Sequence, residues 1–314
     1  MRSSAIVHPD EISEKLVDRL VDADIEILGI HPIGGSQAHI HVERMLELMK
    51  TDQYRHVIDY AYKKGLKVEY EIHAASYLLP RNLFADHPEY FRMDSDGARN
   101  PELNFCVSNN DALSLFAHNA ALLARSLYRS TDNFYFWLDD GWNSFCSCEK
   151  CRELAASDQQ TVALNAALRQ IKKDIPDAKL AFLAYCETML PPIAVTPDED
   201  IFLEYAPFAK YTAKGEDAPD KIIKENEMLK PLMKKFGVYS SKLLEYWYDN
   251  SLFSGWKKPP KEFTLDKEAM QRDIRTAKET GFEYISTFAC FLGEDYEELF
   301  GAPDYMPFGR AIKG

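Results

Sequence analysis

The chain reads NFYFWLDDGW over residues 133–142, a run of aromatic residues that ends in two adjacent acids and a glycine turn. Aromatic residues favour the pleated surface of a β-strand, and an Asp-Gly pair is typical of a turn. The run is apolar without alternation, which is expected of a strand buried on both faces, as in a parallel sheet covered by helices. These residues therefore predict a buried strand over Phe134–Asp139.

Seven other short runs carry a similar strand signal, and most are separated by helical segments. They are Ala5–His8, Ile25–His31, Lys67–His73, Lys179–Cys186, Ile201–Tyr205, Lys242–Tyr248 and Glu283–Phe288. In the intervening segments apolar residues recur at helical spacing, as at Ile12, Leu16 and Leu20. Eight strands that alternate with helices predict an α/β fold, a single (β/α)8 TIM barrel over residues 1–314. An open doubly wound sheet is the main alternative.

The connections between the predicted strands differ in length. Long loops follow the third and fourth strands. Only PPIAVTPDED, residues 191–200, separates the fifth strand from the sixth, and it is too short and too rich in proline for a full helix. We therefore expect an irregular fifth crossover. No change in composition marks a second domain.

The composition is that of a globular protein, with 46% hydrophobic and 28% charged residues over a length of 314. A net charge of −13 repels phosphate backbones, which argues against a nucleic-acid partner. No apolar run approaches the ~20 residues of a membrane span. The first residues show no signal peptide. A complete chain would therefore be cytoplasmic, whereas one that had lost a leader or flanking domains would be periplasmic or secreted.

The carboxyl ends of the strands carry the chemistry in such barrels. Here these ends present polar or aromatic side chains, among them His8, His31, His73, Asp139, Asp140, Glu187, Tyr205, Trp247 and Asp249. Histidines at three successive strand ends, followed by paired acids, are more than contact with solvent requires. We therefore predict a functional face at this end of the barrel.

Asp139 and Asp140 are the first candidates for catalysis. Two carboxylates held close raise each other's proton affinity, so one can stay protonated and act as an acid while the other remains ionised. Glycoside hydrolysis needs this division of labour. The alternative is that one of the acids caps the turn, with Gly141 in a left-handed conformation. In the catalytic interpretation, both carboxylates turn toward the cavity.

Three motifs occur in a specific order: HPEYFRMDSDG at 87–97, FCVSNNDAL at 105–113 and LDDGWNSFCSCEKC at 138–151. They resemble the bacterial "domain of unknown function 4838" family, a group of barrels related to glycoside hydrolases. The resemblance implies a carbohydrate-active barrel and no particular sugar. The acid pair is also distantly similar to that of family 84 and family 20 hexosaminidases, in which the substrate's own 2-acetamido group is the nucleophile. By that similarity Asp139 would orient the acetamido nitrogen and Asp140 would be the general acid/base.

Cys146, Cys148 and Cys151 form a C-x-C-x-x-C motif shortly after the acid pair. Thiolates at this spacing can converge on one tetrahedral zinc ion, with Cys106 as the fourth ligand or His87 in its place. Such a closed site is structural and would hold the two longest loops together. Two alternatives remain: disulfides in an oxidising compartment, and unligated thiols. No neighbouring residue is expected to activate a thiolate for redox catalysis, and we expect no organic cofactor.

Other residues of this face are assigned to carbohydrate binding. His8, His31 and His73 are predicted to bind sugar hydroxyls. Trp247 is predicted to stack on the apolar face of a sugar ring. Arg81 would pair with a sugar carboxylate through two hydrogen bonds from its planar guanidinium group. The remaining candidates are Tyr77, Trp142, Tyr205 and Asp249.

The leading hypothesis is a glycoside hydrolase that acts on a bacterial, plant or host glycan. Asp140 is the general acid/base, Asp139 assists, and Glu187 is a second carboxylate. An inverting uronidase is the first alternative, in which Glu187 or Asp249 activates water. The others are a non-catalytic carbohydrate-binding barrel and a metal-dependent hydrolase built on the three histidines.

Overall fold

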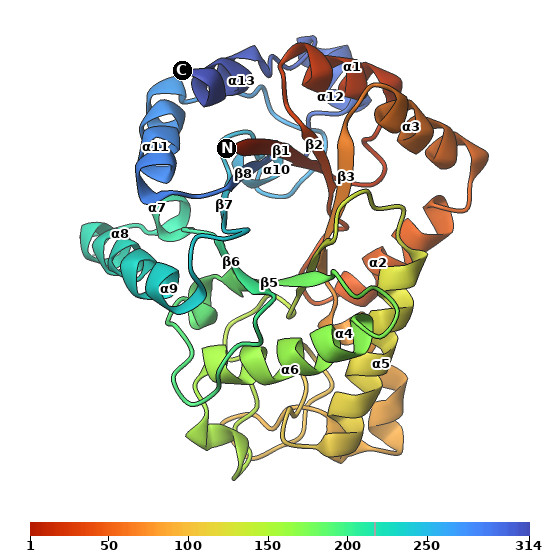
Figure 1. Cartoon of the computed structure of the whole chain (residues 1–314), viewed down its shortest axis with the longest axis vertical. Coiled ribbons are helices and arrows are strands. Elements are labelled where there is room, and N and C mark those ends of the chain that lie inside the picture. Colours follow the sequence, from red (N-terminus) through yellow and green to blue (C-terminus); the bar gives the residue numbers. More distant parts are fainter. Residues whose placement is uncertain (217) are drawn as a thin grey trace.

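The computed structural model describes residues 1–216 and 218–314. In this part of the chain eight parallel strands pair in sequence order, and β8 pairs with β1 to close a barrel (Figure 1). The strands are β1 (Arg2–Val7), β2 (Ile27–Ile30), β3 (Lys67–His73), β4 (Asn133–Trp137), β5 (Lys179–Ala184), β6 (Ile201–Tyr205), β7 (Lys242–Glu245) and β8 (Tyr284–Phe288). The predicted (β/α)8 barrel is confirmed, and the open sheet is excluded because the ladder has no free edge.

Helices surround the strands (Figure 1). The α-helices are α1 (Glu14–Asp22), α2 (Ala38–Leu48), α3 (Asp52–Lys63), α4 (Ala75–Leu78), α5 (Asn110–Ser126), α6 (Ala156–Ile171), α7 (Ala209–Thr212), α8 (Ala218–Glu227), α9 (Leu229–Phe236), α10 (Asn250–Phe253), α11 (Lys267–Thr280), α12 (Glu294–Phe300) and α13 (Met306–Lys313). Short 3-10 helices are η1 (Arg81–Ala85), η2 (Pro88–Tyr90), η3 (Cys151–Glu153) and η4 (Cys186–Thr188). Among the described helices, none has the length and apolar character needed to cross a bilayer.

Polar side chains set where several of the helices begin. Ser13 caps α1 by accepting a hydrogen bond from the backbone N–H of Leu16. Thr51 caps α3 in the same way through the N–H of Tyr54, and Asn109 caps α5. These side chains satisfy backbone donors that have no partner within the first turn. The helices then bury their apolar faces against the outward-facing side chains of the strands.

The connections follow the predicted irregularities. Residues 74–109 after β3 contain only short helices, and the loop after β4 runs over residues 138–155 with η3 alone. Residues 185–200, all of which the structure describes, contain η4 and no α-helix. The long third and fourth loops and the irregular fifth crossover are therefore confirmed. Predicted strand ends differ from the observed ones by up to three residues.

Strand alternation divides the barrel's side chains into an outer and an inner set. On β6, Leu203 and Tyr205 pack outward with the helices, whereas Phe202 faces the interior. The Tyr205 hydroxyl donates a hydrogen bond to the backbone carbonyl of Glu225 in α8. Contrary to the prediction, Tyr205 therefore lies under the helices and not at the mouth of the barrel.

Lys242, at the start of β7, is buried inside the barrel between acids. Its Nζ lies 2.6 Å from Oε1 of Glu71 and 3.2 Å from Oε1 of Glu204. Burial opposes the charge on Lys242, but the two carboxylates raise its pKa, so it remains an ammonium. Glu204 also accepts a 2.7 Å hydrogen bond from the indole N–H of Trp137. This internal cluster thereby fixes Trp137 at the end of β4.

Candidate active site at the barrel mouth

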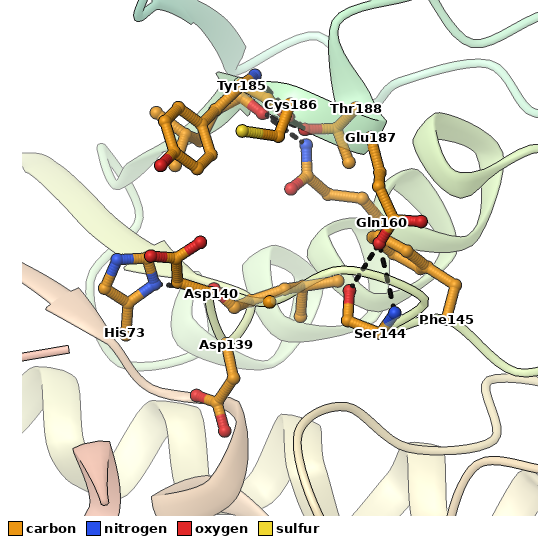
Figure 2. A pocket seen from close by; sticks show the side chains of 13 residues that line it. His73, Asp139, Asp140, Ser144, Phe145, Gln160, Tyr185, Cys186, Glu187 and Thr188 are labelled. Atoms are coloured by element: carbon orange, nitrogen blue, oxygen red, sulfur yellow. Dashed lines mark hydrogen bonds between the residues drawn. The ribbon is translucent and has the colours of Figure 1, made fainter. Parts of the chain in front are cut away.

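Asp140 projects into a pocket at the carboxyl end of β4. The pocket is bordered by His73 on one side and by Tyr185, Cys186 and Glu187 on the other. Figure 2 shows the Asp140 carboxylate directed into the open space, on the side toward Tyr185. The side chain is exposed to solvent, so a bound molecule can reach it.

The carboxyl group of Asp139 turns away from this space (Figure 2), and its side chain is 0% exposed. Its Oδ2 accepts hydrogen bonds from the backbone N–H of Ser76 at 3.0 Å and from the Arg81 guanidinium at 3.3 Å. Burial raises the pKa of Asp139, and these partners offset part of the effect. The expectation that both acids turn toward the cavity is thus wrong for Asp139, because the loop after β3 holds its carboxylate.

Glu187 joins the end of β5 to the loop after β4. Its Oε2 accepts two hydrogen bonds from Ser144, one from the backbone N–H and one from the hydroxyl, each 3.0 Å long. Figure 2 shows both bonds at the far side of the pocket from His73. Glu187 therefore borders the same pocket as Asp140, but one of its oxygens is already used in a loop contact.

The three predicted histidines form a row at the mouth. The ring centroids of His8 and His31 are 6.0 Å apart, and those of His31 and His73 are 5.7 Å apart. The Nδ1 atom of each ring bonds to a backbone carbonyl, at 2.8 Å for His8 and 2.7 Å for the other two. Among the described residues, only four cysteines bring enough ligand atoms together for one metal ion. The histidine-based metal hydrolase therefore has no assembled site.

The aromatic side chains at the end of β7 divide between the outer and the inner side of the barrel. The indole N–H of Trp247 donates to Asp273 of α11 at 3.1 Å, and its ring packs on Phe308 of α13. Trp247 thus faces the helices, contrary to the prediction. Tyr246 faces inward instead, with its ring centroid 5.3 Å from that of Phe288.

Asp249 follows β7 and caps α10. Its Oδ1 accepts hydrogen bonds from the backbone N–H groups of Ser251 and Leu252. Burial raises the pKa of Asp249. Burial also raises the pKa of Tyr246, and the charges of Asp249 and Asp140 add to the increase. Tyr246 therefore lies within electrostatic reach of both acids.

The other predicted residues, Trp142, Tyr77 and Arg81, do not line the Asp140 pocket. Trp142 is 75% exposed on the loop after β4. Tyr77 and Arg81 line a separate groove between α2 and α5. The Arg81 guanidinium is held by Asp139 and by the carbonyl of Pro101. Arg81 is consequently engaged within the protein and not extended toward a substrate carboxylate.

Three aromatic residues at the mouth were not identified from the sequence: Trp137, Tyr185 and Tyr246. The Trp137 ring packs against His31 and His73, with centroid distances of 5.5 and 5.1 Å. Each of the three lies two residues beyond an inward-facing side chain of its own strand. Strand alternation would have found them if one inward residue on each strand had been known.

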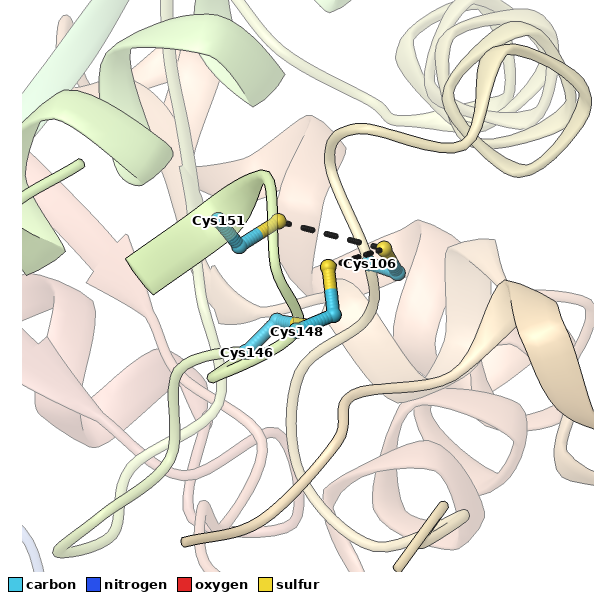
Figure 3. Close-up of side chains that lie close together, drawn as sticks. All are labelled: Cys106, Cys146, Cys148 and Cys151. Atoms are coloured by element: carbon cyan, nitrogen blue, oxygen red, sulfur yellow. Dashed lines mark hydrogen bonds between the residues drawn. The ribbon is translucent and has the colours of Figure 1, made fainter. Parts of the chain in front are cut away.

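Cys106, Cys146, Cys148 and Cys151 form a buried cluster between two loops. Figure 3 shows Cys106 on the loop after β3 and the other three on the loop after β4. Their sulfurs all lie within 4.8 Å of one another. The Cys106 sulfur is 3.7 Å from that of Cys148 and 3.8 Å from that of Cys151, and all four thiols are free. They are therefore not joined as disulfides, and His87 is not part of the cluster.

Several polar groups are directed at these sulfurs. The backbone N–H of Met93 donates to Cys146 Sγ at 3.3 Å, and the Arg99 guanidinium reaches the same sulfur at 3.9 Å. The Ser108 hydroxyl lies 3.0 Å from Cys151 Sγ. Hydrogen bonds and positive charge favour the thiolate, which is the form that binds metal. The cluster thus has the donor set of a site for a thiophilic metal ion.

A sequence comparison assigns the chain to a family. The sequence model described as "Domain of unknown function (DUF4838)" matches residues 36–287. The chain belongs to this family. The matched stretch includes Asp140 and the four cysteines, whereas His8 and His31 precede it. No curated protein sequence matches.

Solved structures with a similar fold include glycoside hydrolases. A β-galactosidase from the psychrophilic Marinomonas ef1 is 10% identical with a TM-score of 0.58, over 91% of this chain and 54% of that chain. A cold-adapted β-galactosidase from Rahnella sp. R3 is 13% identical with a TM-score of 0.55, over 92% and 50%. The chain therefore spans about half the length of these two enzymes. A GH20 module of the pneumococcal exo-β-D-N-acetylglucosaminidase StrH is 10% identical with a TM-score of 0.48, over 99% and 83%. At 10% and 13% identity, the likeness to the two β-galactosidases shows a shared fold alone.

Asp139 is predicted to act on stability through its loop contacts. Asp139→Ala removes the acceptor of the Ser76 N–H and leaves Arg81 without its carboxylate, and breaking a buried ion pair from one side costs roughly 3 kcal/mol. The free energy of unfolding, measured by urea denaturation, should fall by about that amount. Glu102→Ala, which removes an exposed acid from the loop after β3 that also carries Ser76 and Arg81, should change it little. An unchanged unfolding free energy for Asp139→Ala would contradict this role.

Proposed function

We propose that the chain is a glycoside hydrolase whose general acid/base is Asp140. The position of this carboxylate carries the proposal: it is exposed at the carboxyl end of β4, in a pocket bordered by His73, Tyr185 and Glu187. Hydrolysis of a glycosidic bond requires a carboxylic acid that can reach the leaving-group oxygen. Asp140 is free to do so because the neighbouring Asp139 makes the structural contacts between the loops.

Asp140 would act as the acid that gives a proton to the leaving group, and it would also act as a base only if the reaction retains configuration. The proton passes to the glycosidic oxygen as the bond to the anomeric carbon breaks, and in a retaining reaction the resulting carboxylate later takes a proton from water. The ring of Tyr185, which borders the pocket, offers apolar surface for the sugar.

The orientation of Asp139 bears on which mechanism operates. Substrate assistance needs a second acid that contacts the acetamido nitrogen, and the Asp139 side chain is 0% exposed and held by Ser76 and Arg81. This favours a water-activating carboxylate, for which Glu187 and Asp249 are the candidates. The anomeric configuration of the first product, followed by ¹H NMR, separates the two: we expect inversion, and retention would exclude a base of this kind.

The sugar-binding part of the proposal assigns His8, His31 and His73 to substrate hydroxyls. The three rings lie in a row that begins at the Asp140 pocket, which His73 borders. A non-catalytic carbohydrate-binding barrel would use the same residues without the acid. The effect of changing Asp140 therefore distinguishes an enzyme from a binding protein.

Asp140→Asn is predicted to remove turnover and to keep ligand binding. The wild-type chain is first screened on a panel of chromogenic aryl glycosides and polysaccharides. On any substrate found, Asp140→Asn should lower kcat by at least ~100-fold, the usual scale of acid–base catalysis. Affinity measured by calorimetry should stay within about twofold because the amide has nearly the same shape.

Glu149→Gln, an exposed acid on the same loop, serves as the matched control and should leave turnover unchanged. Unchanged turnover in Asp140→Asn would overturn the assignment of the acid. Sugar binding by a wild-type chain that turns over no member of the panel would favour the binding protein.

We also propose that the four-cysteine cluster holds one structural zinc ion. Zinc–sulfur bonds of ~2.3 Å in a tetrahedron place the sulfurs about 3.8 Å apart. The Cys106 sulfur lies 3.7 and 3.8 Å from those of Cys148 and Cys151. Four thiolates leave no open coordination position, which is typical of a structural site and not of a catalytic one. Zinc there would join the loop after β3 to the loop after β4, which carries Asp140.

The zinc proposal predicts one metal ion per chain. Elemental analysis of the purified protein should find zinc at about one equivalent, and titration of the wild type with a mercurial thiol reagent should release it. Cys148→Ser should lower the zinc content, whereas Cys290→Ser and His31→Ala should not. A metal-free wild type that takes up no zinc on refolding, or an intact mass that shows disulfides among these four thiols, would contradict the proposal.

A further inference from the structure

The three histidines at the mouth repeat one hydrogen-bonding arrangement. His8 Nδ1 bonds to the carbonyl of His31, His31 Nδ1 to that of Glu71, and His73 Nδ1 to that of Leu138. A backbone carbonyl can only accept a hydrogen bond, so Nδ1 of each ring must carry the proton. In a neutral ring the other nitrogen, Nε2, is then an acceptor. The fold thus sets the same tautomer three times in a row.

The surroundings of His8 and His31 disfavour the charged form of these two rings. Burial lowers the pKa of His31 well below its usual value, and the neighbouring rings of His73 and His8 lower it further. Burial also lowers the pKa of His8, despite the opposing charges of Asp10 and Asp249. Charging these rings would bring positive charges within about 6 Å of each other, a repulsion that the neutral rings avoid.

The orientation of the rings is fixed by packing. Trp137 and Phe288 contact the His31 ring, with centroids 5.5 and 5.1 Å away. Gly34 passes so close to His73 that an added Cβ would lie 2.6 Å from the Cδ2 atom of the ring. Three acceptor nitrogens are therefore held in place before any ligand arrives.

The Nε2 atoms are the part of each ring that a ligand can reach. Each ring is largely buried, with 6% of His8, 6% of His31 and 9% of His73 exposed. None of the three Nε2 atoms has a hydrogen-bond partner among the described residues, and none is among the fully buried unpartnered atoms. His73 borders the Asp140 pocket. The three Nε2 acceptors therefore form a row that starts next to the proposed acid.

The mouth offers little to an anionic sugar. Asp140, Glu187 and Asp249 give it negative charge. Arg81 is held by Asp139 and Pro101, and Lys258, whose charge lowers the pKa of His8, pairs with Asp295 at 2.8 Å. A carboxylate, sulfate or phosphate brings only acceptor oxygens, and these would oppose three acceptor nitrogens and nearby acids.

We propose that His8, His31 and His73 form a subsite that accepts hydrogen bonds from hydroxyl groups of a neutral sugar and rejects sugars that are anionic at this position. The inference rests on the proposed glycosidase function and names its substrate class. It replaces the uronidase alternative with a site for uncharged, hydroxyl-rich rings.

The tautomers can be tested without any substrate. Long-range ¹H–¹⁵N spectra of the ¹⁵N-labelled protein at pH 7 distinguish the two neutral tautomers and the imidazolium by the shifts of the ring nitrogens. The chain has 8 histidines, and single His→Gln variants assign the three signals. We expect the Nδ1–H form for His8, His31 and His73. An Nε2–H form or an imidazolium at any of them would overturn the proposal.

Specificity is tested with matched pairs of aryl glycosides that share a leaving group and differ only in C6, as a hexoside and its uronide. We expect kcat/KM to be on the order of 100-fold higher for the neutral member, because the uronide lacks the one hydrogen bond that the C6 hydroxyl donates, about tenfold, and its carboxylate is opposed by acceptor nitrogens and nearby acids to a similar extent. His73→Ala should raise KM about tenfold with a smaller change in kcat. His118→Ala, on the exposed face of α5, should change neither.

The outcomes separate this inference from the proposed function. Turnover that depends on Asp140 but favours the uronide would overturn the neutral subsite and leave the glycosidase standing. If no glycoside is turned over, the glycosidase fails, and saturation-transfer NMR with the same sugars decides the subsite. Preferential binding of the neutral members would support it, and equal or preferential binding of uronides would overturn it.

Discussion

The hydrogen bond from the Trp137 indole to the Glu204 carboxylate, inside the barrel, is the contact on which the mouth depends. It is 2.7 Å long and lies between completely buried groups. Burial raises the pKa of Glu204, and Lys242, 3.2 Å away, opposes this rise; Lys242 in turn lies 2.6 Å from Glu71. The cluster fixes the face that Trp137 presents to His31 and His73. The charged groups inside the barrel are costly to bury, but they fix the position of Trp137 beneath the histidines. Recognition of a ligand requires a site that is rigid in this way.

The walls of the site depend on contacts between loops. Asn104, on the loop after β3, accepts a hydrogen bond from the N–H of Asp139 and donates one to its carbonyl, so the backbone just before Asp140 is held on both sides. Glu187 holds the next part of the loop after β4 through its two hydrogen bonds from Ser144. The cysteine cluster joins the same two loops further out. Each of these contacts acts on the loop that carries Asp140, so the exposed acid is placed by residues that have no need to touch a substrate.

The sequence was sufficient for the fold and for most of the strand ends, because strand signals, helix periodicity and turn residues are local. It did not reveal which way a side chain turns once the strand has ended. The Asp139 carboxylate accepts hydrogen bonds from Ser76 and Arg81. These residues are about 60 positions away in the sequence, so no local pattern encodes the contacts. Trp247 was placed on the wrong face because Lys242 was not expected inside the barrel: with Lys242 inward, alternation puts Tyr246 inward and Trp247 outward. By the same alternation on β6, Glu204 faces the interior of the barrel and Tyr205 faces the helices. The histidine row could be located from the sequence, but its tautomers depend on carbonyls of neighbouring strands and only the barrel's register brings these within reach.

The central claim is that Asp140 transfers a proton to the departing oxygen, and the dependence of rate on the leaving group tests it most directly. In a series of aryl glycosides of one sugar, the wild type should show rates that vary little with the acidity of the leaving phenol. In Asp140→Asn the rates should fall steeply as the phenol becomes less acidic, because only the best leaving groups depart without a proton. Equal slopes for the wild type and the variant would contradict the account, since they would show that Asp140 gives no proton to the leaving group.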